Sequence, residues 1–188
     1  MRLRNLIAVS VAGLTLMFGP WATAGWSESV PQRAVAEDDL PTVQNVDIGR
    51  YMGRWYEVAS LPQSFQKGCF ATMADYRLKT NGRVEVINSC RRGGLDGEVT
   101  VAKGRARVVD RQTNAKLKVM FQWPFEGDYW ILALDTDYQH VLVGTPDRES
   151  LWVLSRSVDY DQTVVNGFLD LAEWYGFDVT ALNWTLHR

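Results

Sequence analysis

The chain has 188 residues, a formal net charge of −2 at pH 7 and 46% hydrophobic residues. Its 20 lysines and arginines are balanced by 22 acidic residues and form no cluster, so the sequence offers neither a basic patch for nucleic acid nor a polybasic stripe for a membrane surface. We therefore expect no nucleic-acid partner, and a chain of this length suits one domain.

The first 24 residues have the three-part layout of a secretory signal peptide. Arg2 and Arg4 precede an apolar stretch over residues 6–18, and small residues provide a cleavage site after Ala24, with Ala36 as a second candidate. The alternative is a membrane anchor, but the apolar stretch is shorter than the roughly 20 residues that span a bilayer. No cysteine lies near the cleavage region to carry a lipid. The sequence predicts a soluble protein, exported to the periplasm or secreted.

Residues 25–44 form a polar segment, and residues 45–188 remain as the domain. Its two cysteines, Cys69 and Cys90, are the only ones in the chain, and export to an oxidising compartment favours a disulfide between them. A tight turn at residues 81–82 would place Cys69 several positions away from the residue that pairs with Cys90. Bulges, or a chain that leaves the ladder near Gly68, would have to bring the sulfurs together, so two unbridged thiols stay open as the alternative.

From Gly53 onward, apolar and polar residues alternate in short runs separated by turn residues, which is the pattern of β-strands. A first strand starts at Gly53, and the following strands are expected at residues 70–78, 83–89, 98–110, 115–122, 128–135, 140–146 and 150–156. Strands that follow one another so evenly predict an all-β fold, an eight-stranded up-and-down antiparallel barrel. A barrel of that strand number is just wide enough to hold one small ligand.

The hydrophobic period changes after the last of these strands. Val165, Phe168, Leu169 and Ala172 follow helical spacing, Asp161 is a candidate N-cap, and Gly176 can take the left-handed conformation that ends a helix. We expect one C-terminal α-helix over residues 161–175, packed outside the barrel, and a short final strand within residues 181–188.

Three short motifs resemble the signature of the lipocalins. They are Gly53-Arg54-Trp55-Tyr56-Glu57, Thr136-Asp137-Tyr138 after the sixth strand, and Arg156 at the end of the eighth. The resemblance covers residues 46–188, and within the family the chain looks most like the bacterial lipocalins and their relatives of the apolipoprotein D type. Many bacterial members are outer-membrane lipoproteins, so the resemblance also implies peripheral membrane association, although this chain lacks the cysteine that would carry the lipid.

The resemblance implies a structural role for Gly53, Trp55 and Arg156. Trp55 should plug one end of the barrel, since a buried indole covers a large area. Gly53 should let the entering chain pass close beneath it. As in the family, Arg156 should lie across the indole in a cation–π contact.

Ligand contacts should come from inward-facing residues higher in the barrel, where the strand alternation and the resemblance together indicate Tyr76, Asn88, Phe121, Trp130 and Leu132. The alternative is that these side chains simply fill a small barrel. Asn88 is the informative member, because a buried amide without a partner is costly. It should meet Tyr76, water or a ligand head group.

No catalytic or metal-binding set is visible in the sequence. His140 and His187 are interpreted as lone surface residues, and neither a nucleophile–base arrangement nor metal-ligand spacing accompanies them. Glu57 is interpreted as a hydrogen-bond partner for backbone or tyrosine rather than as an acid or base. With no cofactor expected, the sequence predicts binding, transport or storage of a small lipophilic ligand, a fatty acid, lysophospholipid or similar, in the bacterial cell envelope. The alternatives are a calyx enzyme, an isomerase or hydrolase, and a protein-docking barrel without ligand.

Overall fold

The computed structural model describes residues 40–188, so the predicted signal peptide and residues 25–39 lie outside the described residues. The described elements are α1 (Ile48–Tyr51), β1 (Gly53–Ser60), η2 (Ser64–Gln66), β2 (Cys69–Leu78), β3 (Val84–Arg92), β4 (Val99–Val108), β5 (Lys116–Gln122), β6 (Phe125–Leu134), β7 (His140–Gly144), β8 (Leu151–Ser155), α2 (Gln162–Trp174), η3 (Val179–Ala181) and β9 (Asn183–Trp184).

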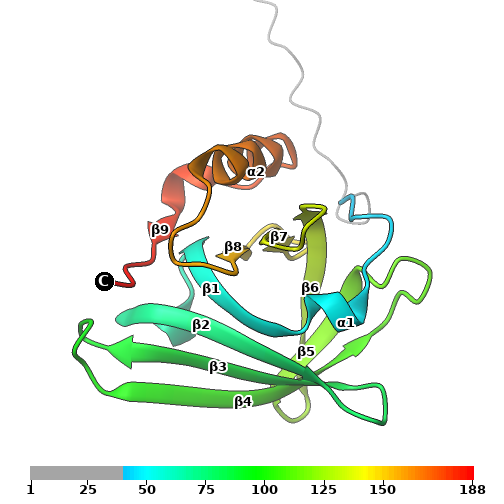
Figure 1. The fold of residues 1–188 in the computed structure, drawn as a ribbon, viewed down its shortest axis with the longest axis horizontal. Coiled ribbons are helices and arrows are strands. Elements are labelled where there is room, and N and C mark those ends of the chain that lie inside the picture. The colour runs from blue at the N-terminus through cyan, green and yellow to red at the C-terminus, as the bar shows by residue number, and fades with distance from the viewer. Residues whose placement is uncertain (1–39) are drawn as a thin grey trace, which may run out of the picture. The chain divides into compact units, whose positions relative to one another are not determined.

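Strands β1 to β8 form a closed antiparallel barrel (Figure 1). Each strand from β2 to β8 pairs with its neighbours in chain order, and β1 closes the ring by pairing with both β2 and β8. The short β9 pairs with β1 outside the ring. This arrangement confirms the predicted eight-stranded barrel with an external helix and a short final strand.

The antiparallel order gives the barrel two distinct ends. Helix α1 and the β2–β3, β4–β5 and β6–β7 connections lie at one end, which we call the closed end (Figure 1). The β1–β2, β3–β4, β5–β6 and β7–β8 connections lie at the opposite end, which we call the mouth. Residues 40–46 run along the barrel before α1: Leu40 is buried, and the N–H of Val43 donates to the Ile131 carbonyl at 3.0 Å.

Two apolar cores lie on either side of the barrel wall. The inner core fills the barrel and includes Trp55, Val84, Leu117, Ile131 and Val143. The outer core lies between the wall and α2 and includes Val58, Leu132, Leu142, Val153, Val165 and Ala172. The wall formed by β6, β7 and β8 is therefore apolar on both faces, because it is covered on both.

Helix α2 has the predicted boundaries. The Asp161 carboxylate caps it by accepting from the Thr163 N–H at 2.8 Å, and Gly176 follows its end with a φ of +88°. Val165 and Ala172 are buried in the outer core, with Phe168 and Leu169 half-buried beside them. No helix of residues 40–188 combines the length and apolar character needed to cross a membrane.

The disulfide between Cys69 and Cys90 is present, with 5.4 Å between the two Cα atoms. The β2–β3 register shifts between Phe70, which faces Arg91, and Met73, which faces Ser89. Ala71 at this shift has a positive φ of 48°. Of the two predicted ways to bring the sulfurs together, the structure shows the bulge, whose extra residue moves Cys69 toward Cys90.

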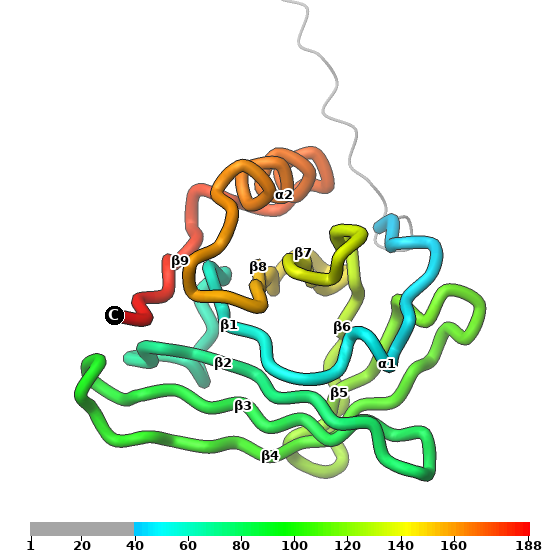
Figure 2. The backbone as a smooth tube through the Cα atoms, viewed as in Figure 1, coloured from blue at the N-terminus to red at the C-terminus, as the bar shows by residue number. Residues whose placement is uncertain are grey.

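The C-terminal segment fills a gap between β1 and β2 (Figure 2). β1 pairs with β2 only from Gly53 to Tyr56. Nearer the mouth, the Thr185 N–H donates to the Val58 carbonyl at 2.9 Å, and the Ala71 N–H donates to the Leu186 carbonyl at 2.8 Å. Residues 183–186 therefore bridge the two strands where they separate, so their polar backbone groups stay paired.

Candidate functional site

Trp55 lies at the closed end with no exposed surface, and Arg156 covers its ring. The guanidinium carbon is 3.8 Å from the ring centroid. The guanidinium also donates to the carbonyls of Arg54, Arg50 and Tyr51 at 2.7, 2.9 and 3.1 Å. Burial lowers the pKa of Arg156 from its usual value. This cation–π contact is the one that the motif implies.

The three motif segments meet around α1. Gly53 has a φ of +96°, and a Cβ atom there would lie 3.3 Å from Nη1 of Arg156. From the second motif, the Tyr138 hydroxyl accepts from the Asp47 N–H at 2.9 Å, and its ring lies 4.1 Å from the Arg50 guanidinium. Residues far apart in the sequence thus form one plug. Position 53 is a glycine, and a side chain there would come too close to the Arg156 guanidinium.

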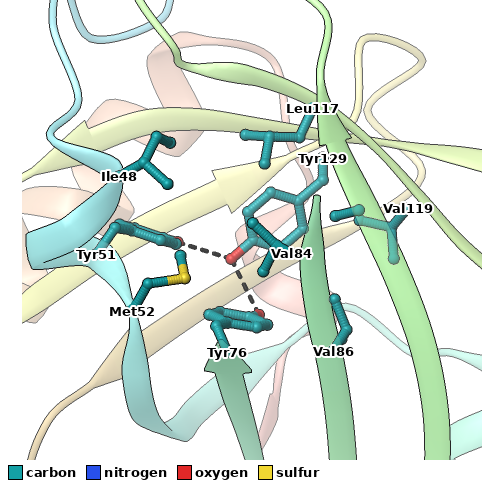
Figure 3. Close-up of a pocket in the computed structure, with 10 residues that line it drawn as sticks. Ile48, Tyr51, Met52, Tyr76, Val84, Val86, Leu117, Val119 and Tyr129 are labelled. Atoms are coloured by element: carbon teal, nitrogen blue, oxygen red, sulfur yellow. Dashed lines mark hydrogen bonds between the residues drawn. The ribbon is translucent and has the colours of Figure 1, made fainter. Parts of the chain in front are cut away.

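Three tyrosine hydroxyls gather inside the closed end (Figure 3). The Tyr129 hydroxyl lies 2.7 Å from that of Tyr51 and 3.2 Å from that of Tyr76. The rings of Tyr51 and Tyr76 are stacked, with centroids 6.0 Å apart. Burial raises the pKa of each of the three phenols well above the usual value, so they stay neutral.

A small apolar cavity adjoins the tyrosine cluster (Figure 3). It is lined by Ile48, Tyr51, Met52, Tyr76, Val84, Val86, Ala106, Leu117, Val119 and Tyr129. Its volume is about 20 Å³, which is room for about one water molecule. The cavity beside the packed tyrosines is therefore too small for a lipid.

Glu57 is the inward-facing carboxylate of the half of the barrel nearer the mouth. It is 5% exposed and accepts three hydrogen bonds, from the Ser60 hydroxyl at 3.3 Å, the Gln66 amide at 2.7 Å and the Thr185 hydroxyl at 2.6 Å. Gln66 in turn accepts from the Trp152 indole N–H at 3.2 Å. The hydrogen-bonding role predicted for Glu57 is confirmed, but with side-chain partners rather than backbone or tyrosine.

Two buried polar atoms on the inner wall have no hydrogen-bond partner within residues 40–188. They are Oγ1 of Thr72, a residue that is 9% exposed, and Oδ1 of Asn88. Asn88 pairs across the ladder with Ala74, and Ala74 pairs with Trp55, so both atoms belong to the inner face. Unpaired buried polar atoms cost about 1–3 kcal/mol each.

The predicted ligand residues divide between the two faces of the wall. Tyr76 lines the cavity, and Asn88 lies on the inner face toward the mouth. Phe121 also belongs to the inner face, where its ring packs on Gly104, and it is 46% exposed toward the mouth.

The inward orientation predicted for Trp130 and Leu132 is wrong. Trp130 faces Lys116 and Gly144 on the outer surface, with the Lys116 ammonium 3.7 Å from its ring centroid. Leu132 is buried in the outer core beneath α2. Tyr129 and Ile131 hold the inward positions of β6 instead. Because α2 covers this wall, both faces of β6 are apolar and its sequence does not show which face points inward.

The surface interpretation of His140 is also wrong. His140 is 8% exposed, its Nδ1 lies 2.8 Å from an Asp135 carboxylate oxygen, and its Nε2 accepts from the Asp161 N–H at 3.2 Å. It thus ties the β6–β7 turn to the start of α2. His187 is half-buried and contacts the Glu57 carbonyl. Within residues 40–188 no group of three His, Cys, Asp or Glu residues could hold a metal ion.

Sequence reasoning missed Tyr51, Tyr129 and Trp152 as inner residues. Tyr129 pairs with Leu117, an apolar residue that alternates with lysines on β5, but the structure is needed to give that pairing. Tyr51 precedes the first strand, and the hydrogen bond from Trp152 to Gln66 joins residues 86 positions apart, so no local pattern reveals either.

Comparisons with known proteins agree with this architecture. The lipocalin-like domain family matches residues 46–187. The chain is 35% identical to the outer membrane lipoprotein Blc of Escherichia coli K12 over 187 residues, covering 98% of this chain and 97% of that protein. It is 37% identical to temperature-induced lipocalin-1 of Arabidopsis thaliana over 156 residues, covering 78% and 82%.

Apolipoprotein D of Bos taurus is 36% identical over 126 residues, which cover 62% of this chain and 64% of that protein. Among solved structures, insecticyanin from Manduca sexta superimposes with a TM-score of 0.64 at 20% identity, over 78% of this chain and 84% of that one, which shows a shared fold. The fold, the plug assembled from three motifs and the family match lead to one conclusion: the chain belongs to the lipocalin family.

Proposed function

We propose that this lipocalin binds and carries a small lipophilic ligand of the lipid class that includes fatty acids and lysophospholipids. The ligand would occupy the half of the barrel nearer the mouth, since the tyrosine cluster fills the closed end. One observation carries the proposal: Thr72 Oγ1 and Asn88 Oδ1 are buried without partners within residues 40–188, on an inner wall that is mostly apolar. Apolar walls with a few polar atoms suit an amphipathic molecule.

We further propose that the protein acts in the bacterial cell envelope after export and removal of residues 1–24. The bacterial relative of nearly equal length is named as an outer membrane lipoprotein, which supports the compartment. Here both cysteines of the chain are joined to each other, so neither thiol is left to carry a lipid. Mass spectrometry of the exported protein tests this: an acyl chain or an intact signal peptide would contradict it.

Exposed aromatic side chains at the mouth support contact with a membrane during ligand transfer. Phe65 on the β1–β2 connection is 61% exposed, and Trp123 and Phe125 on the β5–β6 turn are 77% and 73% exposed. We propose that these residues touch the bilayer when the mouth takes up lipid. Flotation with phospholipid vesicles tests this, with Trp123→Ser expected to reduce binding and Trp174→Ser on α2 as the control.

The central experiment is native mass spectrometry of protein purified from the exporting cell, followed by titration of lipid against tryptophan fluorescence. We expect a co-purified lipid and saturable quenching. Phe121→Ala removes an inner apolar contact and should weaken binding several-fold, whereas Trp130→Ala, on the outer face, should leave it unchanged. If no lipid co-purifies and no quenching appears up to the solubility limit, the protein is not a lipid carrier.

We propose carriage without chemical conversion. In support, the Glu57 carboxylate already accepts three hydrogen bonds from neutral side chains, an arrangement that holds structure rather than moving a proton. An enzyme would convert added lipid and lose that activity in Glu57→Gln, and recovery of unchanged lipid after prolonged incubation separates the two functions.

A further inference from the structure

Glu57 is a negative charge on the inner wall with no positive partner. Its three donors, from Ser60, Gln66 and Thr185, are all uncharged. None of the ion pairs formed within residues 40–188 includes it. A carboxylate offers about four lone-pair sites, so one site remains for a donor that enters the barrel.

Glu57 and the two unpartnered atoms lie on three consecutive strands of the barrel, β1, β2 and β3. The β1–β2 ladder ends with Tyr56 facing Met73, and the next position along each strand is Glu57 on β1 and Thr72 on β2. Asn88 lies on the neighbouring strand β3, where it faces Ala74, two residues from Thr72. The inner faces of these three strands therefore carry a carboxylate, a hydroxyl and an amide, all able to accept hydrogen bonds.

Arg156 and Arg92 bond to backbone carbonyls rather than to this carboxylate, and His187 contacts the backbone carbonyl of Glu57. Arg156 lies beneath Trp55 at the closed end, where three backbone carbonyls accept from its guanidinium. Arg92, at the mouth end of β3, donates to the carbonyls of Phe65 and Lys67 in the β1–β2 connection. An anionic head group beside Glu57 would therefore be repelled by the carboxylate, and neither arginine would offset that repulsion.

Burial is the main cause that raises the pKa of Tyr76, Tyr129 adds to that rise, and the negative charge of Glu57 is the smallest of the causes. Any group that enters between Glu57 and the tyrosine cluster experiences the same field, because low-dielectric surroundings screen it weakly.

We propose that Glu57 selects the head group of the ligand: the barrel takes lipids with an uncharged or cationic head that donates hydrogen bonds, in preference to a carboxylate on the same chain. This inference rests on the proposed lipid-binding function and narrows its ligand class. A hydroxyl or ammonium head would fill the open site on Glu57 and pair with Thr72 and Asn88, whereas a fatty acid would bring an unpaired negative charge against Glu57.

The test uses three probes with one hydrocarbon chain and different heads: oleyl alcohol, oleylamine and oleate. Dissociation constants are measured by tryptophan fluorescence near neutral pH, below the solubility limit of each probe. For the wild-type protein we expect the alcohol and the amine to bind about tenfold or more tightly than oleate. Oleate binding as tightly as the alcohol would overturn the inference, while lipid binding itself would stand.

The variant Glu57→Gln removes the charge and keeps two of the three hydrogen bonds, because the amide oxygen can accept from Ser60 and Thr185 while the amide nitrogen cannot accept from Gln66. Oleate should gain about tenfold in affinity, oleylamine should lose a similar factor, and oleyl alcohol should change little. Glu98→Gln is the control, because it removes an exposed charge before β4 at the mouth. Solvent screens that charge, so the order of affinities of the three probes should not change.

A purely structural role for Glu57 predicts something different. Glu57 also ties η2 and the C-terminal segment to β1, so loss of that role would weaken all three probes alike and lower the urea midpoint. If Glu57→Gln weakens the binding of all three probes equally, Glu57 does not select ligands by charge.

If Glu57→Gln does not fold, the order of the three wild-type affinities still decides the question. If none of the probes binds to the wild-type protein, the proposed function itself fails.

Discussion

At the scale of single residues, the closed end depends on Arg156. Its guanidinium covers the Trp55 ring and donates to three backbone carbonyls, so its removal uncovers the ring and takes a donor from each carbonyl, of which that of Tyr51 still accepts from the Trp55 indole. Arg156→Ala should lower the free energy of unfolding by about 2–4 kcal/mol, measured by urea denaturation. Arg54→Ala is the control, because its ion pair with Asp75 is exposed and should be worth under about 1 kcal/mol. Equal losses in the two variants would contradict this role for Arg156.

The tyrosine cluster gives the protein a defined response to alkaline pH. Burial raises the pKa of Tyr51, Tyr76 and Tyr129 above the value of about 10 that they take when unfolded. Their contribution to stability is fully present below that pH and is lost as the pH rises above it, since only the unfolded state then releases protons. Spectrophotometric titration should show that these three of the seven tyrosines ionise only as the barrel unfolds. Ionisation of all seven in the folded state would contradict the buried cluster.

At the scale of elements, the C-terminal segment completes the barrel wall through Glu57. Thr185 donates to the Glu57 carboxylate and bonds through its backbone to Val58. Thr185→Val should cost about 1–3 kcal/mol, because the buried carboxylate loses one of its donors. Hydrogen exchange should also become faster at the Ala71 amide, which bonds to the Leu186 carbonyl. Thr80→Val, on the exposed β2–β3 turn, is the matched control and should change neither quantity.

At the scale of the whole molecule, the disulfide links the mouth ends of β2 and β3 across 21 positions of sequence. Replacing both Cys69 and Cys90 by serine should lower stability by about 3 kcal/mol, because a closed loop of this length restricts the unfolded chain. Urea denaturation of the double variant measures the loss. A midpoint unchanged from that of the oxidised protein would contradict it.

The sequence by itself determined the barrel, the external helix and the plug. Period-two alternation, turn residues at regular intervals and one change to helical period are local signals, and the resemblance of the motifs around Gly53, Trp55 and Arg156 to those of the lipocalins implied the plug. The need for a bulge beside Cys69 was also visible, because strand register follows from counting residues between a turn and a cysteine.

Only the tertiary structure decided which face of each strand points inward where both faces are apolar. Helix α2 covers the wall of β6 to β8, so the sequence around Trp130 and Leu132 resembles that of residues inside the barrel, although both lie on its outer face. The same holds for contacts between distant segments. Glu57 gains its partners from η2 and from the C-terminal segment, and His140 is buried because α2 begins above it. Such contacts depend on the tertiary fold. Residues this far apart in the sequence produce no periodic pattern that would reveal their contact.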